Sequence, residues 1–331
     1  MQIPNKPATG PSVWTGKDIR ERSDWRRTFE RSAIGEMPAL LQAAKNGQDI
    51  GLHSISDYPN LACILMAARE ELLHGLGFVM LQGFPVGSFA LPDIDTLFLA
   101  MGRLIGRPIS QNSYGDLLGH VRDEGKRVII TGDTRGARGY LSNEKLLFHT
   151  DLGDAVALLC VQKSLSGGMS SMSSSLSVFN EILKTHPEYL PVYFNGFAFR
   201  STEADGVRTN WRLPVFTYEH GLLSCAIRRM AIETARLNGE PYTDLENAAL
   251  EFLDATAARE DLRYDMHMEP GDIQVLNNFV TFHSRTEFID AERPELKRHM
   301  LRLWLQFAEG RAFLRKYPTI YDGVPHTITR Q

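Results

Sequence analysis

Apolar residues recur at helical spacing in two stretches of the N-terminal third. Between Tyr58 and Gly75 they fall on one face of a helix, and a second series begins after Pro92 and ends at Gly106. Between these stretches the short run Phe78–Leu81 has the length of a strand and precedes a glycine and a proline. The pattern therefore predicts a helix, a strand and a second helix, in that order.

Beyond residue 139 the pattern changes to short apolar runs broken by Gly, Ser and Asp. The predicted strands are 146–150, 155–162, 169–175, 272–276, 280–283 and 299–306, and the predicted helices are 177–190 and 245–260. Thr243 and Glu246 form a candidate capping box before the second helix. This order predicts a mainly β sandwich or barrel with added helices. A parallel α/β sheet would need steady alternation, and the chain has no GxGxxG or P-loop motif.

No repeat, low-complexity tract or composition break marks a linker. We therefore expect a single domain over residues 1–331. Within it we expect a polar surface arm (1–35), a helix-rich N-terminal part (36–138), a β core with a helical insert (139–310) and a tail (311–331).

Composition narrows the class of protein. The chain has 331 residues, 43% of them hydrophobic, and a net charge of −4, which argues against nucleic acid as a partner. No apolar run approaches the roughly 18 residues of a membrane span, and the N-terminus has no apolar signal-peptide core. Cys63, Cys160 and Cys225 are isolated and odd in number, which argues against a disulfide framework. We expect a cytoplasmic protein without a membrane segment.

The ten histidines are the residues to test for chemistry, because the chain contains no Gly-x-Ser-x-Gly and no HExxH motif. What remains is His-x-Asp/Glu, which with a distant His makes the two-His, one-carboxylate site of non-haem Fe(II) oxygenases. Side chains two residues apart on a strand share a face, so both can reach one metal ion. About one match is expected by chance. The chain has three, at His149-Thr-Asp151, His186-Pro-Glu188 and His267-Met-Glu269.

Context separates the three matches. His149 and Asp151 lie in a β-like run that another apolar strand follows at once. His186 ends a predicted helix and precedes Pro187, which cannot donate to a strand ladder. His267 runs into a Pro-Gly turn. For His186 and His267 we favour a surface histidine beside an acid, whereas for His149 the local pattern alone favours neither interpretation.

Two arginines near the C-terminus strengthen the case for His149. Arg298 follows His283 by 15 residues, and Arg302 lies four further on, so both face the same way on a strand. A buried guanidinium beside a metal suits a dicarboxylate co-substrate, because its fork binds a carboxylate through two hydrogen bonds. Salt bridges to Glu292 or Glu295 are the less favoured alternative.

Four segments together resemble the TauD/TfdA group of Fe(II)/2-oxoglutarate dioxygenases, which includes clavaminate synthase-like enzymes. In family order they are FHTDLGDAVALLC, GGMSSMSSSLSVFNEIL, NNFVTFHSRTEF and KRHMLRLWL, within residues 139–306. The resemblance implies a double-stranded β-helix (jelly-roll) core, with Fe(II), 2-oxoglutarate and O2 as cofactor and co-substrates.

The resemblance also implies roles for individual residues. It makes His149, Asp151 and His283 the iron ligands, and Arg298 the clamp for the distal carboxylate of 2-oxoglutarate. Ser170 stands where relatives often have a threonine that shares this carboxylate. Arg302 matches a second arginine near substrate or oxoglutarate, and its role stays open. Asp151 argues against a halogenase, since halogenating relatives replace this carboxylate by a small residue.

The implied reaction oxidises an unactivated C–H bond and yields succinate and CO2. Hydroxylation is the usual outcome, while desaturation and cyclisation use the same oxidant. We expect a small carboxylate- or amino-acid-type metabolite, of secondary metabolism, and candidate substrate contacts at Tyr140, Asp154, Arg285, Phe288 and Arg302. Gln111, Asn112 and Tyr114 are weaker candidates for the cavity wall, because ordinary loop polarity also explains them.

Two alternatives stay open. One is an oxoglutarate-independent non-haem iron oxygenase, and the other is a jelly-roll binding protein without catalysis. A homodimer is a further expectation, because the helical N-terminal third offers surface.

Overall fold

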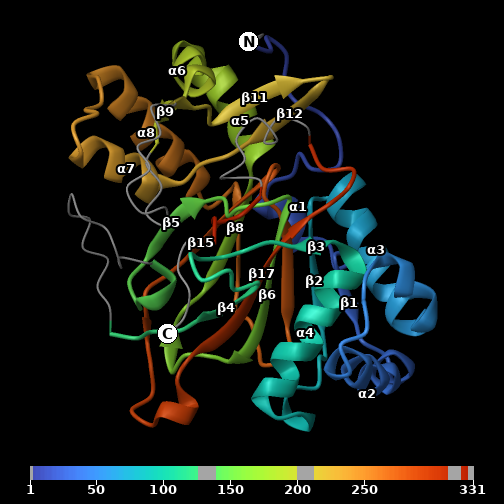
Figure 1. The fold of residues 1–331 in the computed structure, drawn as a ribbon. Coiled ribbons are helices and arrows are strands. Elements are labelled where there is room, and N and C mark those ends of the chain that lie inside the picture. The colour runs from blue at the N-terminus through green and yellow to red at the C-terminus, as the bar shows by residue number, and fades with distance from the viewer. Residues whose placement is uncertain (1–2, 126–138, 200–211, 312–321, 327–331) are drawn as a thin grey trace.

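Two facing β-sheets form the centre of the protein (Figure 1), in a computed structural model that describes residues 3–125, 139–199, 212–311 and 322–326. Neighbouring strands pair antiparallel, except that β1 runs parallel to β2. In spatial order the larger sheet contains β1 (Arg26–Thr28), β2 (Phe78–Gln82), β14 (Ile273–Asn277), β6 (Ala155–Gln162), β17 (His299–Gln306) and β3 (Arg107–Pro108), and β4 (Leu118–Val121) also pairs with β17.

The smaller sheet contains β13 (Arg263–Met266), β8 (Ser170–Ser174), β15 (Thr281–Arg285) and β5 (Leu146–His149), in that order. Met172 and Phe282 of this sheet share one buried core with Val156 and Trp304 of the larger sheet. Alternation along each strand explains this, because every second side chain points between the sheets. The prediction of a mainly β fold with added helices is confirmed.

Three helices cover the outer face of the larger sheet, as Figure 1 shows: α2 (Arg31–Lys45), α3 (Pro59–His74) and α4 (Leu91–Ile105). Leu301, Leu303 and Leu305, the outward residues of β17, share a second buried core with the apolar faces of these helices. The periodicity predicted α3 and α4 with ends correct to within two residues. The predicted strand between them is β2.

A helical insert separates β8 from β13. Its helices are α5 (Ser175–Thr185), α6 (Leu190–Asn195), α7 (Arg229–Leu237) and α8 (Asp244–Ala257), and its strands are β9 (Phe197–Ala198), β10 (Arg212–Leu213), β11 (Phe216–Glu219) and β12 (Leu222–Cys225). The predicted capping box is present: the Thr243 side chain accepts from the Glu246 amide, and the Glu246 side chain accepts from the Thr243 amide. The remaining short elements are α1 (Gly16–Arg20), β7 (Ser166–Gly167), β16 (Phe288–Ile289), and the 3-10 helices η1 (Leu52–Asp57), η2 (Val86–Ser88), η3 (Gly139–Leu141), η4 (Pro187–Tyr189) and η5 (Pro294–Leu296).

The N-terminal 35 residues are not a surface arm. Trp14, Ile19 and Trp25 are buried in the core between the sheets, and β1 adds an edge strand to the larger sheet. Charge along this stretch suggested solvent exposure, but three large apolar side chains are sufficient to anchor it, since burying each contributes about 1.5–3 kcal/mol. The β core likewise begins before residue 139, because β2, β3 and β4 all join the larger sheet.

All three cysteines lie in the described part of the chain, and none is disulfide-bonded. Among the helices that the structure describes, none combines the length and apolar character needed to cross a membrane.

A histidine pair joins the edge strand β4 to β17. Nδ1 of His120 lies 2.9 Å from Nε2 of His299, and a carboxylate oxygen of Asp95 on α4 lies 3.7 Å from the other ring nitrogen of His120. Burial, followed by the proximity of His120 and Arg122, lowers the pKa of His299 to about 4. The His299 ring is therefore uncharged at neutral pH.

This pair predicts a loss of stability in acid. Below the ordinary histidine pKa of about 6.5 the unfolded chain binds a proton that the folded chain does not. The free energy of unfolding should therefore fall as pH drops from about 6.5 to 4. Melting temperatures across this range should fall more steeply for the wild type than for His299→Gln. Parallel curves would show that His299 does not take up a proton on unfolding.

Candidate active site

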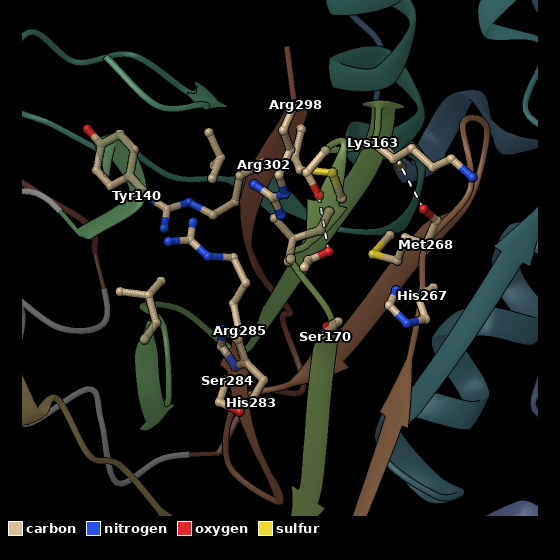
Figure 2. Close-up of a pocket in the computed structure, with 18 of the residues that line it drawn as sticks. Tyr140, Lys163, Ser170, His267, Met268, His283, Ser284, Arg285, Arg298 and Arg302 are labelled. Atoms are coloured by element: carbon tan, nitrogen blue, oxygen red, sulfur yellow. Dashed lines mark hydrogen bonds between the residues drawn. The ribbon is translucent and has the colours of Figure 1, made fainter. Parts of the chain in front are cut away.

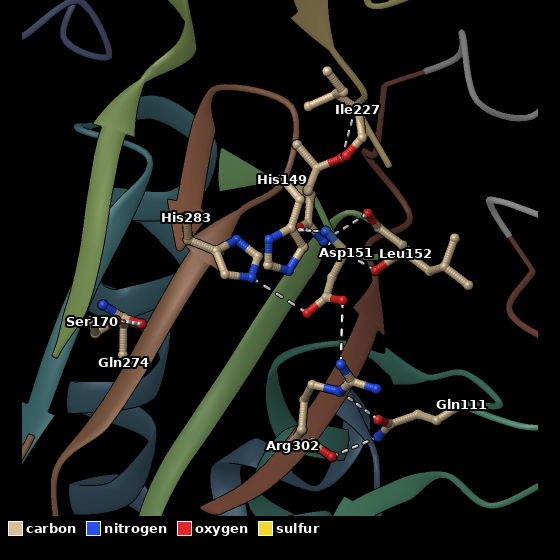
Figure 3. Close-up of polar contacts among 12 residues, drawn as sticks. Gln111, His149, Asp151, Leu152, Ser170, Ile227, Gln274, His283 and Arg302 are labelled. Carbon is tan, nitrogen blue, oxygen red and sulfur yellow. Dashed lines mark hydrogen bonds and ion pairs between the residues drawn. The ribbon is translucent and has the colours of Figure 1, made fainter. Parts of the chain in front are cut away.

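Two histidines from neighbouring strands meet in the smaller sheet. His149 ends β5 and pairs in register with His283 of β15, and the two ring centroids are 4.3 Å apart. With the Asp151 carboxylate they form a group whose three potential ligand atoms all lie within 4.8 Å of one another (Figure 3). In the part of the chain that the structure describes, this is the single cluster of three such residues that could hold a metal ion.

Asp151 reaches this cluster through a turn and not through strand alternation. β5 ends at His149, one residue earlier than expected, and the backbone then leaves the sheet. The turn is pinned at Thr150, whose amide donates to the Ile227 carbonyl and whose hydroxyl accepts from the Ile227 amide. The His-x-Asp spacing therefore brings both side chains to one cluster, but through a turn and not through the strand face that we expected.

Asn278 holds the far side of the same turn, and the sequence analysis missed it. Its side-chain oxygen accepts from the Asp151 amide at 3.2 Å, and its Nδ2 donates to the carbonyls of Leu152 and Gly153. Gly153 has a φ of +73°, and a Cβ there would lie 2.8 Å from the Leu305 carbonyl oxygen. Both left-handed backbone and close approach require glycine at this position. The feature of the sequence that could have pointed to Asn278 is its position five residues before the predicted metal ligand His283.

Hydrogen bonds orient the ring of His149. Its Nδ1 lies 2.8 Å from the Leu147 carbonyl, which can only accept, so this nitrogen carries the proton and Nε2 offers its lone pair. Nε2 of His283 lies 3.6 Å from Oδ2 of Asp151. The other ring nitrogen of His283 is buried without a hydrogen-bond partner among the described residues. Each histidine thus presents one nitrogen toward the Asp151 carboxylate.

The protonation states suit a divalent metal. Desolvation, with His283 adding to it, lowers the pKa of His149 to about 3, so this ring is neutral at physiological pH. Burial alone would raise the pKa of Asp151, but Arg302 and His283 more than offset it and keep the pKa below its usual value. A neutral imidazole and an ionised carboxylate are the forms that bind metal. Two imidazoles and one carboxylate fit the facial donor set of non-haem Fe(II).

A cavity of about 230 Å³ opens beside these three residues, between the two sheets. Arg298, just before β17, and Arg302, four residues further on within β17, both line it, as their spacing predicted, and Arg285 of β15 lines it as well (Figure 2). Burial lowers the pKa of Arg298 to about 10, and burial together with Arg298 lowers the pKa of Arg285 to about 9. Both guanidiniums remain charged at neutral pH, so the cavity favours an anion.

Arg298 offers the cavity a buried guanidinium for a small carboxylate. It is 8% exposed, and its Nη1 has no hydrogen-bond partner in the described structure. Ser170 lines the same cavity, and its hydroxyl donates to the Gln274 side chain at 3.1 Å. Gly168 has a φ of +69°, a left-handed conformation that favours glycine, and a Cβ there would lie 2.8 Å from Oγ of Ser164.

The predicted substrate residues divide into two groups. Tyr140 and Arg285 line the cavity, whereas Asp154 and Phe288 do not. Asp154 is buried and accepts a hydrogen bond from the Phe307 amide, so it supports the loop after β17. Phe288 is buried behind the wall, with the Arg285 and Arg298 guanidiniums 4.8 and 5.1 Å from its ring centroid. Sequence proximity to the His-x-Asp motif and to His283 was therefore misleading for these two residues.

Arg285 lines the cavity and also forms hydrogen bonds to the backbone before β5. Its Nη2 donates to the carbonyls of Ser142 and Glu144, at 2.7 and 2.6 Å. These contacts hold the segment that leads into β5, which carries His149. Arg285 therefore has a structural task whatever it contributes to ligand binding.

The other two His-x-acid matches are not part of this cluster. Nδ1 of His186, just after α5, lies 2.9 Å from Oε1 of Glu188, the acid of the same motif. His267 and Glu269 line the opposite end of the cavity, where Glu269 pairs with Lys163 at 2.8 Å. Neither match brings together three potential metal ligands among the described residues.

Comparison with known proteins places these observations in a family. A profile of the family "Taurine catabolism dioxygenase TauD, TfdA family" matches residues 43–304. The chain is 31% identical to FR-33289 synthase of Streptomyces rubellomurinus over 326 residues, 95% of this chain and 94% of that protein.

Two solved structures share the fold. Asparagine oxygenase, in complex with Fe(II), 2S,3S-3-hydroxyasparagine and succinate, has a TM-score of 0.67 at 17% identity, and the match covers 93% of this chain and all of that one. The non-haem iron oxygenase OrfP, in complex with Fe and alpha-ketoglutaric acid, has a TM-score of 0.59 at 12% identity, over 85% of this chain and 94% of that one. These matches confirm the jelly-roll core. The chain belongs to the TauD/TfdA dioxygenase family and is an oxygenase that depends on Fe(II) and 2-oxoglutarate.

Proposed function

We propose that His149, Asp151 and His283 hold the catalytic Fe(II). The observation that carries this proposal is the convergence of two imidazole nitrogens and one carboxylate within 4.8 Å, with the His149 ring neutral and the Asp151 carboxylate ionised. Bound Fe(II) supplies the activation of O2, and the protein supplies its position, its open coordination sites and shielding from water. His149 and His283 are oriented by strand pairing, and Asp151 by the turn that Thr150 and Asn278 hold.

Arg298 and Ser170 form the proposed binding site for the distal carboxylate of 2-oxoglutarate. Arg298 is a buried cation with an unpartnered Nη1, and Ser170 lines the same cavity. A dicarboxylate can therefore reach from these two residues toward the metal ligands within one cavity. One end of 2-oxoglutarate would bind the Arg298 guanidinium, and the other end would bind the metal.

The substrate that the site supports best is a small amino-acid-like molecule with an acidic group. The cavity is small, and the buried Arg285 guanidinium lines it beside Arg298 and Arg302, which the co-substrate and Asp151 occupy. Arg285 therefore favours an anionic group on the substrate. The names of the fold relatives agree with this class: one structure holds 3-hydroxyasparagine, and OrfP has been solved with succinate and (3S)-hydroxy-L-arginine. We propose hydroxylation of a C–H bond as the reaction, within secondary metabolism.

A substrate panel tests this proposal. The purified enzyme with Fe(II), 2-oxoglutarate and O2 should form succinate faster when an amino acid or acidic analogue is added. Asparagine, arginine and taurine are the first panel members, with derivatives whose acidic group is blocked as an amide or ester as matched controls. Mass spectrometry should find a product heavier than its substrate by one oxygen atom. Succinate formation that no acidic or amino-acid compound increases would contradict the substrate class, and a product lighter by two hydrogens would contradict hydroxylation.

A further inference from the structure

Gln111 makes a set of buried hydrogen bonds behind the proposed metal site. It is 1% exposed, and its side-chain oxygen accepts from Nε of Arg302 at 2.8 Å. Its Nε2 donates to the backbone carbonyls of Arg302 and Leu117, at 2.6 and 3.0 Å. Gln111 does not line the cavity. Its amide therefore serves the strand β17 and the arginine on it, and not a ligand.

Arg302 is fixed on three sides. Gln111 holds its Nε, while the rings of Tyr140 and Trp304 lie with their centroids 4.8 and 4.3 Å from its guanidinium carbon. Its Nη1 points to Oδ1 of Asp151 at 3.3 Å (Figure 3). A planar guanidinium held in this way has little freedom to follow a moving carboxylate.

The two oxygens of Asp151 consequently have different surroundings. Oδ1 faces Arg302, whereas Oδ2 faces Nε2 of His283 at 3.6 Å. The oxygen beside the histidine is the one that can share a metal ion with that ring. The oxygen beside the arginine is occupied by a charge-assisted contact and is turned away from a second metal bond.

We propose that Gln111 is a positioning residue for the metal centre: it fixes Arg302, which in turn holds Asp151 so that one carboxylate oxygen alone faces the metal. This inference rests on the proposed function, because it takes Asp151 as a ligand. It also gives Arg302 a task at the metal, where the sequence had left its role open between substrate and oxoglutarate.

Gly119 shows how closely this arrangement is packed. Gly119 lies on β4 and pairs in register with Arg302 of β17. A Cβ at Gly119 would lie 2.5 Å from Oε1 of Gln111. Gly119→Ala therefore displaces the Gln111 amide without altering Gln111, Arg302 or a proposed ligand. It provides a second, independent perturbation of the same contact.

The test measures metal affinity in the full-length apoprotein, without turnover. Fe(II) is titrated anaerobically against a coloured chelator into wild type, Gln111→Leu, Gly119→Ala and Arg302→Lys. Loss of a partner that orients a ligand typically weakens metal binding 10- to 100-fold, and we expect this range for Gln111→Leu. Gly119→Ala should follow in the same direction. Arg302→Lys keeps the charge but lacks the fork, so it should not preserve wild-type affinity.

Gln306→Leu is the matched control, since it removes a buried amide from the far end of the same strand, where Gln306 contacts Asp322. It should leave Fe(II) affinity within twofold of wild type even if it lowers the melting temperature as much as Gln111→Leu. Should Gln111→Leu fail to fold, Gly119→Ala decides the question. Wild-type affinity in the Gln111 and Gly119 variants overturns this inference alone. If the wild type binds no Fe(II), the proposed function fails and the inference fails with it.

Discussion

Asp151→Ala should lose turnover, because without this carboxylate the protein should bind Fe(II) too weakly to support the reaction with 2-oxoglutarate. The metal contributes several kcal/mol of stabilisation to the reaction, so its loss lowers the rate roughly 1000-fold or more. The variant should keep the fold, because Asp151 lies in a turn that Thr150 and Asn278 pin through backbone contacts. Succinate formation under saturating Fe(II), 2-oxoglutarate and substrate measures the effect.

A second substitution separates ligand loss from misfolding. Removing the carboxylate leaves Arg302 as an unpaired, largely buried cation, which costs about 3–5 kcal/mol of stability. Asp151→Asn retains an oxygen for Arg302 and should recover most of this stability while remaining inactive. An Asp151→Ala protein that turns over at the wild-type rate would refute the assignment of this ligand.

Arg298→Ala should raise the KM for 2-oxoglutarate strongly and affect Fe(II) affinity little. Truncating one partner of a buried charged contact costs about 2–4 kcal/mol, which is roughly 30- to 1000-fold in affinity. Arg298→Lys should recover part of this loss, since it restores the charge without the paired N–H groups. Initial rates at varied 2-oxoglutarate, with Fe(II) fixed, provide the measurement.

The matched control for this substitution is Arg293→Ala. Arg293 lies on the connection just before β17 and its side chain contacts Glu295, where both are largely exposed. It carries the same charge and should leave the KM unchanged. An equal rise in KM for both variants would show that the overall field of the protein, and not a contact from Arg298, attracts the co-substrate.

The core of the site could be predicted because it depends on local patterns. The register of β5 against β15 brings His149 opposite His283. The even spacing of Arg298, just before β17, and Arg302, within it, directs both side chains to the cavity. Each of these relations follows from the period of a strand and from a motif that one family uses repeatedly. Residue type and spacing were therefore sufficient to identify these side chains.

The supporting contacts could not be predicted in this way. Gln111 meets Arg302 across 191 residues of chain, and Asn278 meets Asp151 across 127. No periodicity records such pairs, because a single amide in a loop resembles ordinary loop polarity. The N-terminal arm failed for a related reason: its charges dominate the local pattern, while Trp14 and Trp25 decide its position through burial. Asp154 and Phe288 show the converse, since nearness in sequence did not place them in the cavity.

The most direct test of the account is an anaerobic titration of the apoprotein with Fe(II) and then 2-oxoglutarate, followed by visible absorption. Chelation of iron by 2-oxoglutarate in this site should produce a metal-to-ligand charge-transfer band. We predict a band that is absent in His149→Ala and needs more 2-oxoglutarate to form in Arg298→Ala. A band of wild-type strength in His149→Ala, or tight Fe(II) binding with no band in the wild type, would contradict the proposed metal and co-substrate site.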